Sequence, residues 1–249
     1  RPYAIASLIE PNSNLSNLIS KLIEWENKET PPVTIIKPDS SWFYYDKGSN
    51  PGDEWFQPWF LNKDWSKGIA KFGYGGDGEI TQLDDGGDLG NKNLAYYFRK
   101  SFEVSKESKK PFLIANVVRD DGVIVYLNGT KVITDNMPTD NITYLTPATG
   151  TAAPNGGPND EKNPKRFLID GDLLEVGTNV IAAQVHQIHG QSSDVAFQLE
   201  LLASDANPKN YIKELITGIN GEMILESAMK ILPSSITITL SANWLASSI

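Results

Sequence analysis

Hydrophobic positions near the start of the 249-residue chain are spaced three and four apart, which is the spacing of one face of a helix. They are Leu15, Leu18, Ile19, Leu22 and Ile23. Pro31 and Pro32 then end any helix, because proline lacks an N–H donor and disfavours helical geometry in the residue before it. We therefore expect a helical N-terminal extension over residues 1–32.

From residue 33 the pattern changes to short runs rich in β-forming residues, separated by Gly, Asn, Asp and Pro. Residues 112–118 form an almost continuous apolar run, which is expected for a strand buried on both faces. Residues 195–202 alternate apolar and polar side chains, as a strand with one buried face does. Strands at short intervals without intervening helices predict a mainly β fold, an antiparallel sandwich over residues 33–204.

One turn in this region has a specific signature. Asn128-Gly129 separates two apolar runs, residues 123–127 and 130–133. Asn-Gly readily adopts the two positive φ angles of a type I′ turn, so we expect a β-hairpin here. Residues 149–165 are rich in Gly, Pro, Asn and Ala, and we expect them to form a long exposed loop.

After residue 204 helical spacing returns, with Pro208 suited to a first helical turn. The apolar positions are Tyr211, Ile212, Leu215 and Ile216. Residues 235–240 alternate as a strand does. We expect residues 205–249 to form a C-terminal extension of short helices and a single strand. Self-assembly through the terminal extensions is one hypothesis, because a strand added to another sheet's edge gains main-chain hydrogen bonds.

Composition excludes several classes of function. With 31 Asp and Glu against 22 Lys and Arg, the net charge is −9, which argues against nucleic-acid binding. No apolar run approaches the roughly 20 residues that cross a bilayer, so we expect no membrane insertion. The absence of cysteine excludes disulfides, thiolate metal sites and cysteine nucleophiles, and it fits a bacterial or archaeal source, or a cytosolic one. Because the chain opens at Arg1 rather than Met, a removed signal peptide is compatible with a secreted or cell-surface protein.

Several ordered motifs between residues 42 and 202 carry a family resemblance. They are WFYYDKGSNP at 42–51, WSKGIAKFGYGGDG at 65–78, YYFRKSFEV at 96–104, DDGVIVYLNG at 120–129, NMP at 136–138, GTNVIAAQVHQ at 177–187, and Ser192-Ser193-Asp194 followed by Phe197. Together they resemble the galactose-binding-like jelly-roll β-sandwich domain that is appended to secreted phosphoesterases, glycosidases and lamin-tail-domain surface proteins. The resemblance implies a domain that accompanies a catalyst without being one. It also implies glycan binding through end loops and, in many relatives, a structural calcium.

Clustered aromatic residues are the first candidates for a ligand site. Four tryptophans lie within 24 positions, joined by Phe and Tyr residues: Trp42, Trp55, Trp59, Trp65, Phe43, Tyr44, Tyr45, Phe56 and Phe60. Exposed aromatic rings can stack on the C–H bonds of a sugar, whereas buried ones would fill the core of the sandwich. Trp55 and Trp59 follow a polar run and are the better surface candidates, and Tyr44 is a further one.

Adjacent carboxylates are the candidate metal ligands. Asp120 and Asp121 precede Gly122 at the entrance to the predicted hairpin, where they could supply oxygen ligands to Ca²⁺ and so assist sugar binding. Alternatively, their side chains cap the turn through hydrogen bonds to the local backbone. The sequence leaves both interpretations open.

The chain has two histidines, His186 and His189, which are too few for a two-metal phosphoesterase centre. His186 either forms a buried hydrogen bond or contacts a ligand. No nucleophile elbow, phosphate loop or dinucleotide fingerprint is present, so we do not expect an enzyme.

Two functions from different classes follow. The first is a secreted or cell-surface binding module for carbohydrate, with Trp55, Trp59, Tyr44, Asp120 and His186 as candidate ligand-binding residues. The second is a structural or adhesive subunit of a surface filament or envelope layer. A third hypothesis is that the chain is the accessory domain of a larger secreted phosphoesterase or hydrolase.

Overall fold

The computed structural model describes residues 31–152 and 163–205. The predicted terminal helices and the predicted strand at 235–240 lie outside the described residues, as does part of the predicted loop at 149–165. Within the described ranges, no helix has both the length and the apolar character needed to cross a membrane.

The described residues form two sheets of six strands each. The first sheet contains β1 (Val33–Ile36), β4 (Phe72–Tyr74), β5 (Thr81–Gln82), β7 (Phe112–Asp120), β10 (Lys165–Asp170) and β12 (Val195–Ser204). The second sheet contains β2 (Ser41–Tyr45), β3 (Ser66–Ile69), β6 (Ala95–Val104), β8 (Gly122–Leu127), β9 (Thr130–Asp135) and β11 (Gly177–His186). A short 3₁₀ turn, η2 (Gly171–Leu173), precedes β11.

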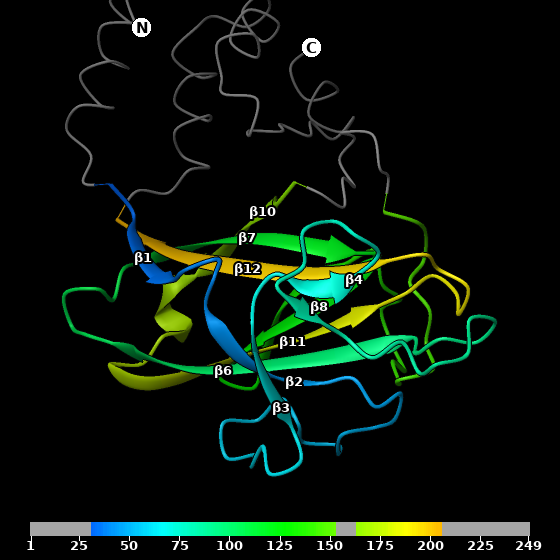
Figure 1. Ribbon diagram of the computed structural model, residues 1–249. Coiled ribbons are helices and arrows are strands. Elements are labelled where there is room, and N and C mark those ends of the chain that lie inside the picture. Colours follow the sequence, from blue (N-terminus) through cyan, green and yellow to red (C-terminus); the bar gives the residue numbers. More distant parts are fainter. Residues whose placement is uncertain (1–30, 153–162, 206–249) are drawn as a thin grey trace, which may run out of the picture.

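The strand order brings distant segments together (Figure 1). The first sheet runs β10-β7-β12-β4-β5, and β1 also pairs with β12. The second runs β3-β2-β6-β11-β8-β9, with every pairing antiparallel. The mainly β prediction is therefore confirmed, with one exception to the antiparallel rule, because β4 and β5 pair in parallel.

The main core lies where the two sheets face each other. Phe98 of β6 stacks on Phe197 of β12, with ring centroids 4.1 Å apart, and Trp42 meets Phe197 edge-on at 5.5 Å. Alternate residues of β6 (Tyr96, Phe98, Phe102 and Val104) are all buried in this core. Burial of such large aromatic surfaces supplies the main driving force for stacking the sheets.

Two local predictions are confirmed in detail. Asn128 and Gly129 have φ angles of 50° and 82° and join β8 to β9, as the Asn-Gly signature predicts. Strand β7 is buried on both faces, since Leu113 faces the core and Ile114, pointing the other way, is 6% exposed.

The outer face of the second sheet is covered by two loops. Side chains that point away from the core include Tyr97, Ile124, Tyr126 and Ala182, which belong to two further apolar clusters. The first loop, residues 46–65, packs Trp55 and neighbouring aromatics on this face. The second loop, residues 136–150, adds further apolar side chains. The loops and the outer face of the second sheet thus form a second, thinner layer of apolar packing outside the main core.

Candidate ligand-binding pocket

A pocket with a volume of about 500 Å³ lies over the outer face of the second sheet, between the two covering loops. We call it the outer pocket. It is lined by Asn50, Gly52, Asp53, Trp55, Phe56, Tyr97, Ile124, Tyr126, Lys131, Thr139, Asp140, Asn141, Ile142, Thr143, Tyr144 and Gln184. Pockets of about 300–1,000 Å³ commonly hold small molecules in proteins.

Aromatic rings form much of the lining. Phe56 of the first loop stacks on Tyr126 of β8, with centroids 4.4 Å apart and an interplanar angle of 18°. Trp55 meets Tyr97 of β6 edge-on at 4.9 Å and Tyr126 at 5.6 Å. Tyr144 of the second loop packs against the same cluster. These contacts hold the rings in fixed orientations against one another.

The first loop is fixed by the buried guanidinium of Arg99, which is 2% exposed on β6. It donates to the carbonyls of Trp55 and Gln57, the latter at 3.0 Å, and to the side-chain oxygen of Asn62 at 2.8 Å. Burial lowers the pKa of Arg99 to about 10, so the group stays charged at neutral pH. Because these acceptors belong to one loop, a single side chain sets the conformation of the segment that carries Trp55 and Phe56.

Polar side chains surround the aromatic lining. Asn50 donates to Asp53 at 2.9 Å and accepts from the Gly52 amide at 2.9 Å, so the first loop orients its own carboxylate. On the second loop, Thr139 donates to Asp140 at 3.0 Å. Hydrogen-bond acceptors and donors therefore flank the rings on both sides of the pocket.

Two phenols and an amide add hydrogen-bonding groups to the lining. Burial raises the pKa of Tyr126 and of Tyr97, so both hydroxyls are protonated at physiological pH. The Gln184 carboxamide on β11 lies 3.3 Å from the Tyr126 hydroxyl. The aromatic rings can stack on the apolar face of a ligand, and the polar side chains can exchange hydrogen bonds with the edges of that ligand.

The structure places the three aromatic candidates differently. Trp55 lines the outer pocket but is 6% exposed, so the expected surface position is corrected to a buried one. Trp59, on the same loop, is 65% exposed, and its indole donates to Glu54 at 3.3 Å. Tyr44 packs into the main core beside Phe72, with centroids 5.4 Å apart, away from the pocket.

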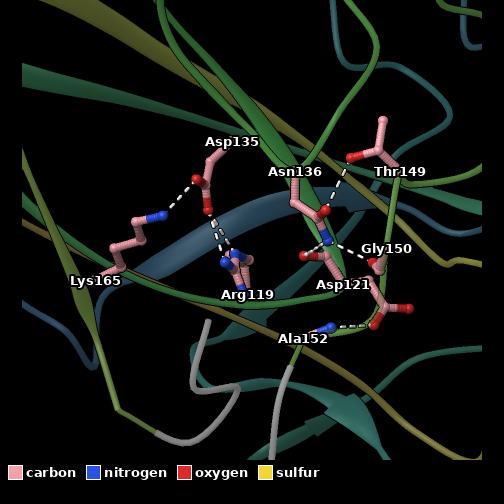
Figure 2. Close-up of polar contacts among 8 residues, drawn as sticks. All are labelled: Arg119, Asp121, Asp135, Asn136, Thr149, Gly150, Ala152 and Lys165. Carbon is pink, nitrogen blue, oxygen red and sulfur yellow. Dashed lines mark hydrogen bonds and ion pairs between the residues drawn. The ribbon is translucent and has the colours of Figure 1, made fainter. Parts of the chain in front are cut away.

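Asp120 and Asp121 are both 3% exposed, and Asp121 accepts from backbone amides that are distant in the sequence rather than from the local turn that the capping alternative predicts (Figure 2). Its two carboxylate oxygens accept backbone amides, from Ala152 at 2.6 Å and from Ile188 at 2.8 Å. Among the residues that the structure describes, no three His, Asp or Glu side chains gather as a metal site requires. Ca²⁺ takes six to eight oxygen ligands, and its binding by Asp120 and Asp121 stays a prediction.

His186 lies behind the pocket rather than in it. The side chain is fully buried, and its Nδ1 is 2.7 Å from the Thr146 carbonyl. Its Nε2 is 3.2 Å from the carboxamide of Gln184, which does line the pocket. His186 thus makes the buried hydrogen bond that one reading of the sequence predicts, and it reaches the pocket through one intermediate residue.

Sequence reasoning did not single out most of the pocket residues. Tyr126 and Gln184 lie on strands whose alternation could have placed them on the outer face. Asp140 and Tyr144 lie in an irregular loop that carries no comparable periodic signal. Their approach to Trp55 depends on how the loop packs on the sheet.

No protein-family model matches the chain, and no curated protein does. Among solved structures, the chain is similar to a β-glycosidase from Bacteroides vulgatus, with 14% identity and a TM-score of 0.43 over 70% of this chain and 20% of that chain. It is similar to a Bacteroides uniformis β-glucuronidase with 11% identity and a TM-score of 0.45, over 70% of this chain and 18% of that one. It is also similar to a β-glucuronidase from an uncultured Clostridium sp., with 10% identity and a TM-score of 0.42, over 72% of this chain and 30% of that chain.

The chain therefore spans less than one third of the length of each of these glycosidases. The three TM-scores lie below 0.5, so no functional assignment rests on them.

Proposed function

We propose that this chain is a non-catalytic carbohydrate-binding module whose ligand occupies the outer pocket. One observation carries the proposal: a pocket of about 500 Å³ combines stacked aromatic rings with amide, hydroxyl and carboxylate groups. A pyranose ring has apolar C–H faces and a periphery of hydroxyls, and both parts find partners in this lining. Aromatic faces supply apolar contact, while the polar groups fix orientation.

The fixed first loop also supports binding of a small, rigid ligand. Arg99 and the ring contacts of Trp55 order the loop before any ligand arrives. A preorganised site loses less conformational entropy on binding, so more of the contact energy contributes to affinity. Trp59, exposed and oriented by Glu54, offers a further stacking surface on the same loop.

We further propose what the family resemblance implies about fold type, location and catalysis. The two sheets would form a galactose-binding-like jelly roll, secreted or displayed on a prokaryotic cell surface, and any catalysis would belong to another domain. The alternative of a structural or adhesive subunit depends on terminal extensions outside the described residues, and it stays a prediction.

A glycan array probed with the full chain tests the proposal. We expect binding to a limited set of glycans, followed by measurable affinity for the smallest of them in isothermal titration calorimetry. Phe56→Ala and Tyr144→Ala should weaken binding roughly tenfold or more, because each removes an aromatic surface from the pocket.

Phe43→Ala is the matched control. Phe43 is on β2, beside Lys67 of β3, and it does not line the pocket. Loss of the Phe43 ring should therefore leave the affinity for the ligand unchanged. Circular dichroism of each variant separates lost binding from lost folding. Absence of binding to every glycan class, or equal affinity in all variants, would overturn the proposal.

A further inference from the structure

One tryptophan of the first loop is turned outward. The other aromatic residues of this loop pack in the apolar cluster on the outer face of the second sheet; they are Trp55, Phe56, Phe60 and Trp65. Trp59 belongs to none of the apolar clusters of the described residues, and its side chain is 65% exposed. Among the described residues, no other Phe, Tyr or Trp is exposed to this extent. The loop therefore presents one large aromatic face to the solvent.

The Trp59 indole is held in place although it is exposed. Its Nε1–H donates to the carboxylate of Glu54 at 3.3 Å. Two backbone hydrogen bonds also fold this segment, from the Gln57 amide to the Glu54 carbonyl at 2.9 Å and from the Phe60 amide to the Gln57 carbonyl at 3.1 Å. A ring whose orientation is set before binding loses little conformational entropy when a ligand stacks on it.

Trp59 lies near the outer pocket without lining it. Glu54, its hydrogen-bond partner, stands between Asp53 and Trp55 in the chain, and both of these line the pocket. Trp55 and Trp59 are four residues apart, so their Cα atoms can be at most about 14 Å apart even in an extended chain. The separation of the two positions is therefore within the span of a short oligosaccharide.

The surface at Trp59 offers both kinds of contact that a sugar unit needs. The exposed face of the indole provides apolar contact for the C–H bonds of a pyranose ring. The carboxylate of Glu54 accepts from the indole through one oxygen, and a carboxylate has further lone pairs that can accept from sugar hydroxyls. The pair thus repeats, outside the pocket, the combination of aromatic and polar groups found inside it.

We propose that Trp59 and Glu54 form a second sugar subsite, and that the ligand of the outer pocket is an oligosaccharide or polysaccharide chain rather than a single sugar. This inference rests on the proposed function and makes its ligand class more specific. One sugar unit occupies the outer pocket, and another unit of the same chain stacks on Trp59.

Affinity as a function of ligand length tests the inference, measured with the full chain in isothermal titration calorimetry. The probes are glucose, mannose and N-acetylglucosamine, each compared with the corresponding di-, tri- and tetrasaccharides of cellulose, mannan and chitin. In a series that binds, the tetrasaccharide should bind roughly tenfold or more tightly than the monosaccharide, because it adds contact with an aromatic face. Equal affinity at every length would overturn the inference while leaving the proposed function intact. Absence of binding in all three series would also overturn the inference, and the glycan array decides separately on the proposed function.

Variants of Trp59 assign the gain in affinity to this ring. Trp59→Ala should remove the gain on lengthening, and Trp59→Tyr should retain part of it, because a phenol still offers an aromatic face. Leu89→Ala is the matched control, since Leu89 is 76% exposed between β5 and β6 and lies outside both the first loop and the pocket lining. It should keep the full gain. A gain that survives in Trp59→Ala, or that Leu89→Ala loses to the same extent, would overturn the inference.

Hydroxyl-radical footprinting with mass spectrometry locates the bound chain. We expect the tetrasaccharide to reduce the oxidation of Trp59 several-fold, and the monosaccharide to leave it close to that of the free protein. Equal protection of Trp59 by both ligands, or none by a tetrasaccharide that binds, would contradict a second subsite at this position.

Discussion

Arg99 is the residue on which the shape of the candidate site depends most directly. Its guanidinium is buried and donates to acceptors that all belong to residues 55–62 of the first loop. A lysine at this position could not reproduce these bonds, because its ammonium is a single point of charge without the planar fork of arginine. The residue therefore links the folding of β6 to the presentation of Trp55 and Phe56.

His186 predicts a pH dependence of stability. An unfolded histidine titrates near pH 6.5, whereas burial lowers the pKa of folded His186 to about 4. Between these values the unfolded chain binds a proton that the folded chain does not. The free energy of unfolding should therefore fall as the pH drops from 6.5 to 4, by up to about 3 kcal/mol. Urea denaturation at a series of pH values measures it.

Burial also raises the pKa of Asp46, and this shift opposes the loss of stability that His186 causes at low pH. The control therefore compares the pH profiles of the wild type and of two histidine variants, which share Asp46. His186→Gln should lack the histidine contribution over this pH range, and His189→Gln should retain it. Parallel pH profiles for the wild type and His186→Gln would contradict the assignment.

At the scale of elements, Asp135 at the end of β9 connects the two sheets (Figure 2). Its carboxylate accepts from Arg119 of β7 at 2.7 and 2.9 Å and from Lys165 of β10 at 2.6 Å. Burial alone would raise the pKa of Asp135, but the hydrogen bonds from Lys165 and Arg119 hold it below its ordinary value. An edge strand of one sheet is thereby tied to two strands of the other.

Asp135→Asn should lower the free energy of unfolding by about 3 kcal/mol, because it leaves the buried cation of Arg119 without its carboxylate. Chemical denaturation at pH 7 measures the change. The wild type should lose the same contribution below about pH 3.8, as the carboxylate is protonated.

The ion pair between Lys110 and Asp205 provides a matched control, since the Asp205 side chain is 53% exposed. Asp205→Asn should change stability by less than about 0.5 kcal/mol, as expected for an exposed pair. Similar losses in the two variants would mean that Asp135 does not join the sheets as described.

Elements with strong local patterns could be predicted from sequence, and the site could not. The β8–β9 hairpin follows from Asn128-Gly129, and the double burial of β7 follows from its apolar run. The outer pocket instead joins residues 50–56 to residues 139–144, which are about ninety positions apart. Their meeting depends on the β6-β11-β8 order and on loop packing. The spacing between Trp55 and Trp59 likewise did not reveal that only one is exposed.

At the scale of the whole molecule, the main core and the outer pocket lie on different faces of the sheets. The inner faces of the sheets hold the main core, while the outer face of the second sheet holds the pocket. Under the proposed function, changes in the covering loops should alter ligand binding with little effect on the packing between the sheets. Mutations such as Phe56→Ala should for this reason affect affinity more than stability.

A fragment of residues 31–205 should fold by itself, because it contains both sheets and the main core between them. We expect one cooperative thermal transition, with Tm within about 4 °C of the full chain, which corresponds to about 1 kcal/mol. Differential scanning calorimetry measures both the cooperativity of the transition and its Tm. An insoluble fragment, or one without a cooperative transition, would show that the core needs residues beyond these limits.

The pairing of β1 with β12 has a consequence for how such a unit can be combined with others. Val33 lies opposite Ala203 in this pairing, so the first and last strands of the sandwich run side by side in opposite directions. A unit whose entry and exit points are neighbours can be inserted into a surface turn of a host protein without pulling that turn apart. The same geometry would let a short linker join residues 33 and 204, opening a new start point elsewhere in a circularly permuted chain.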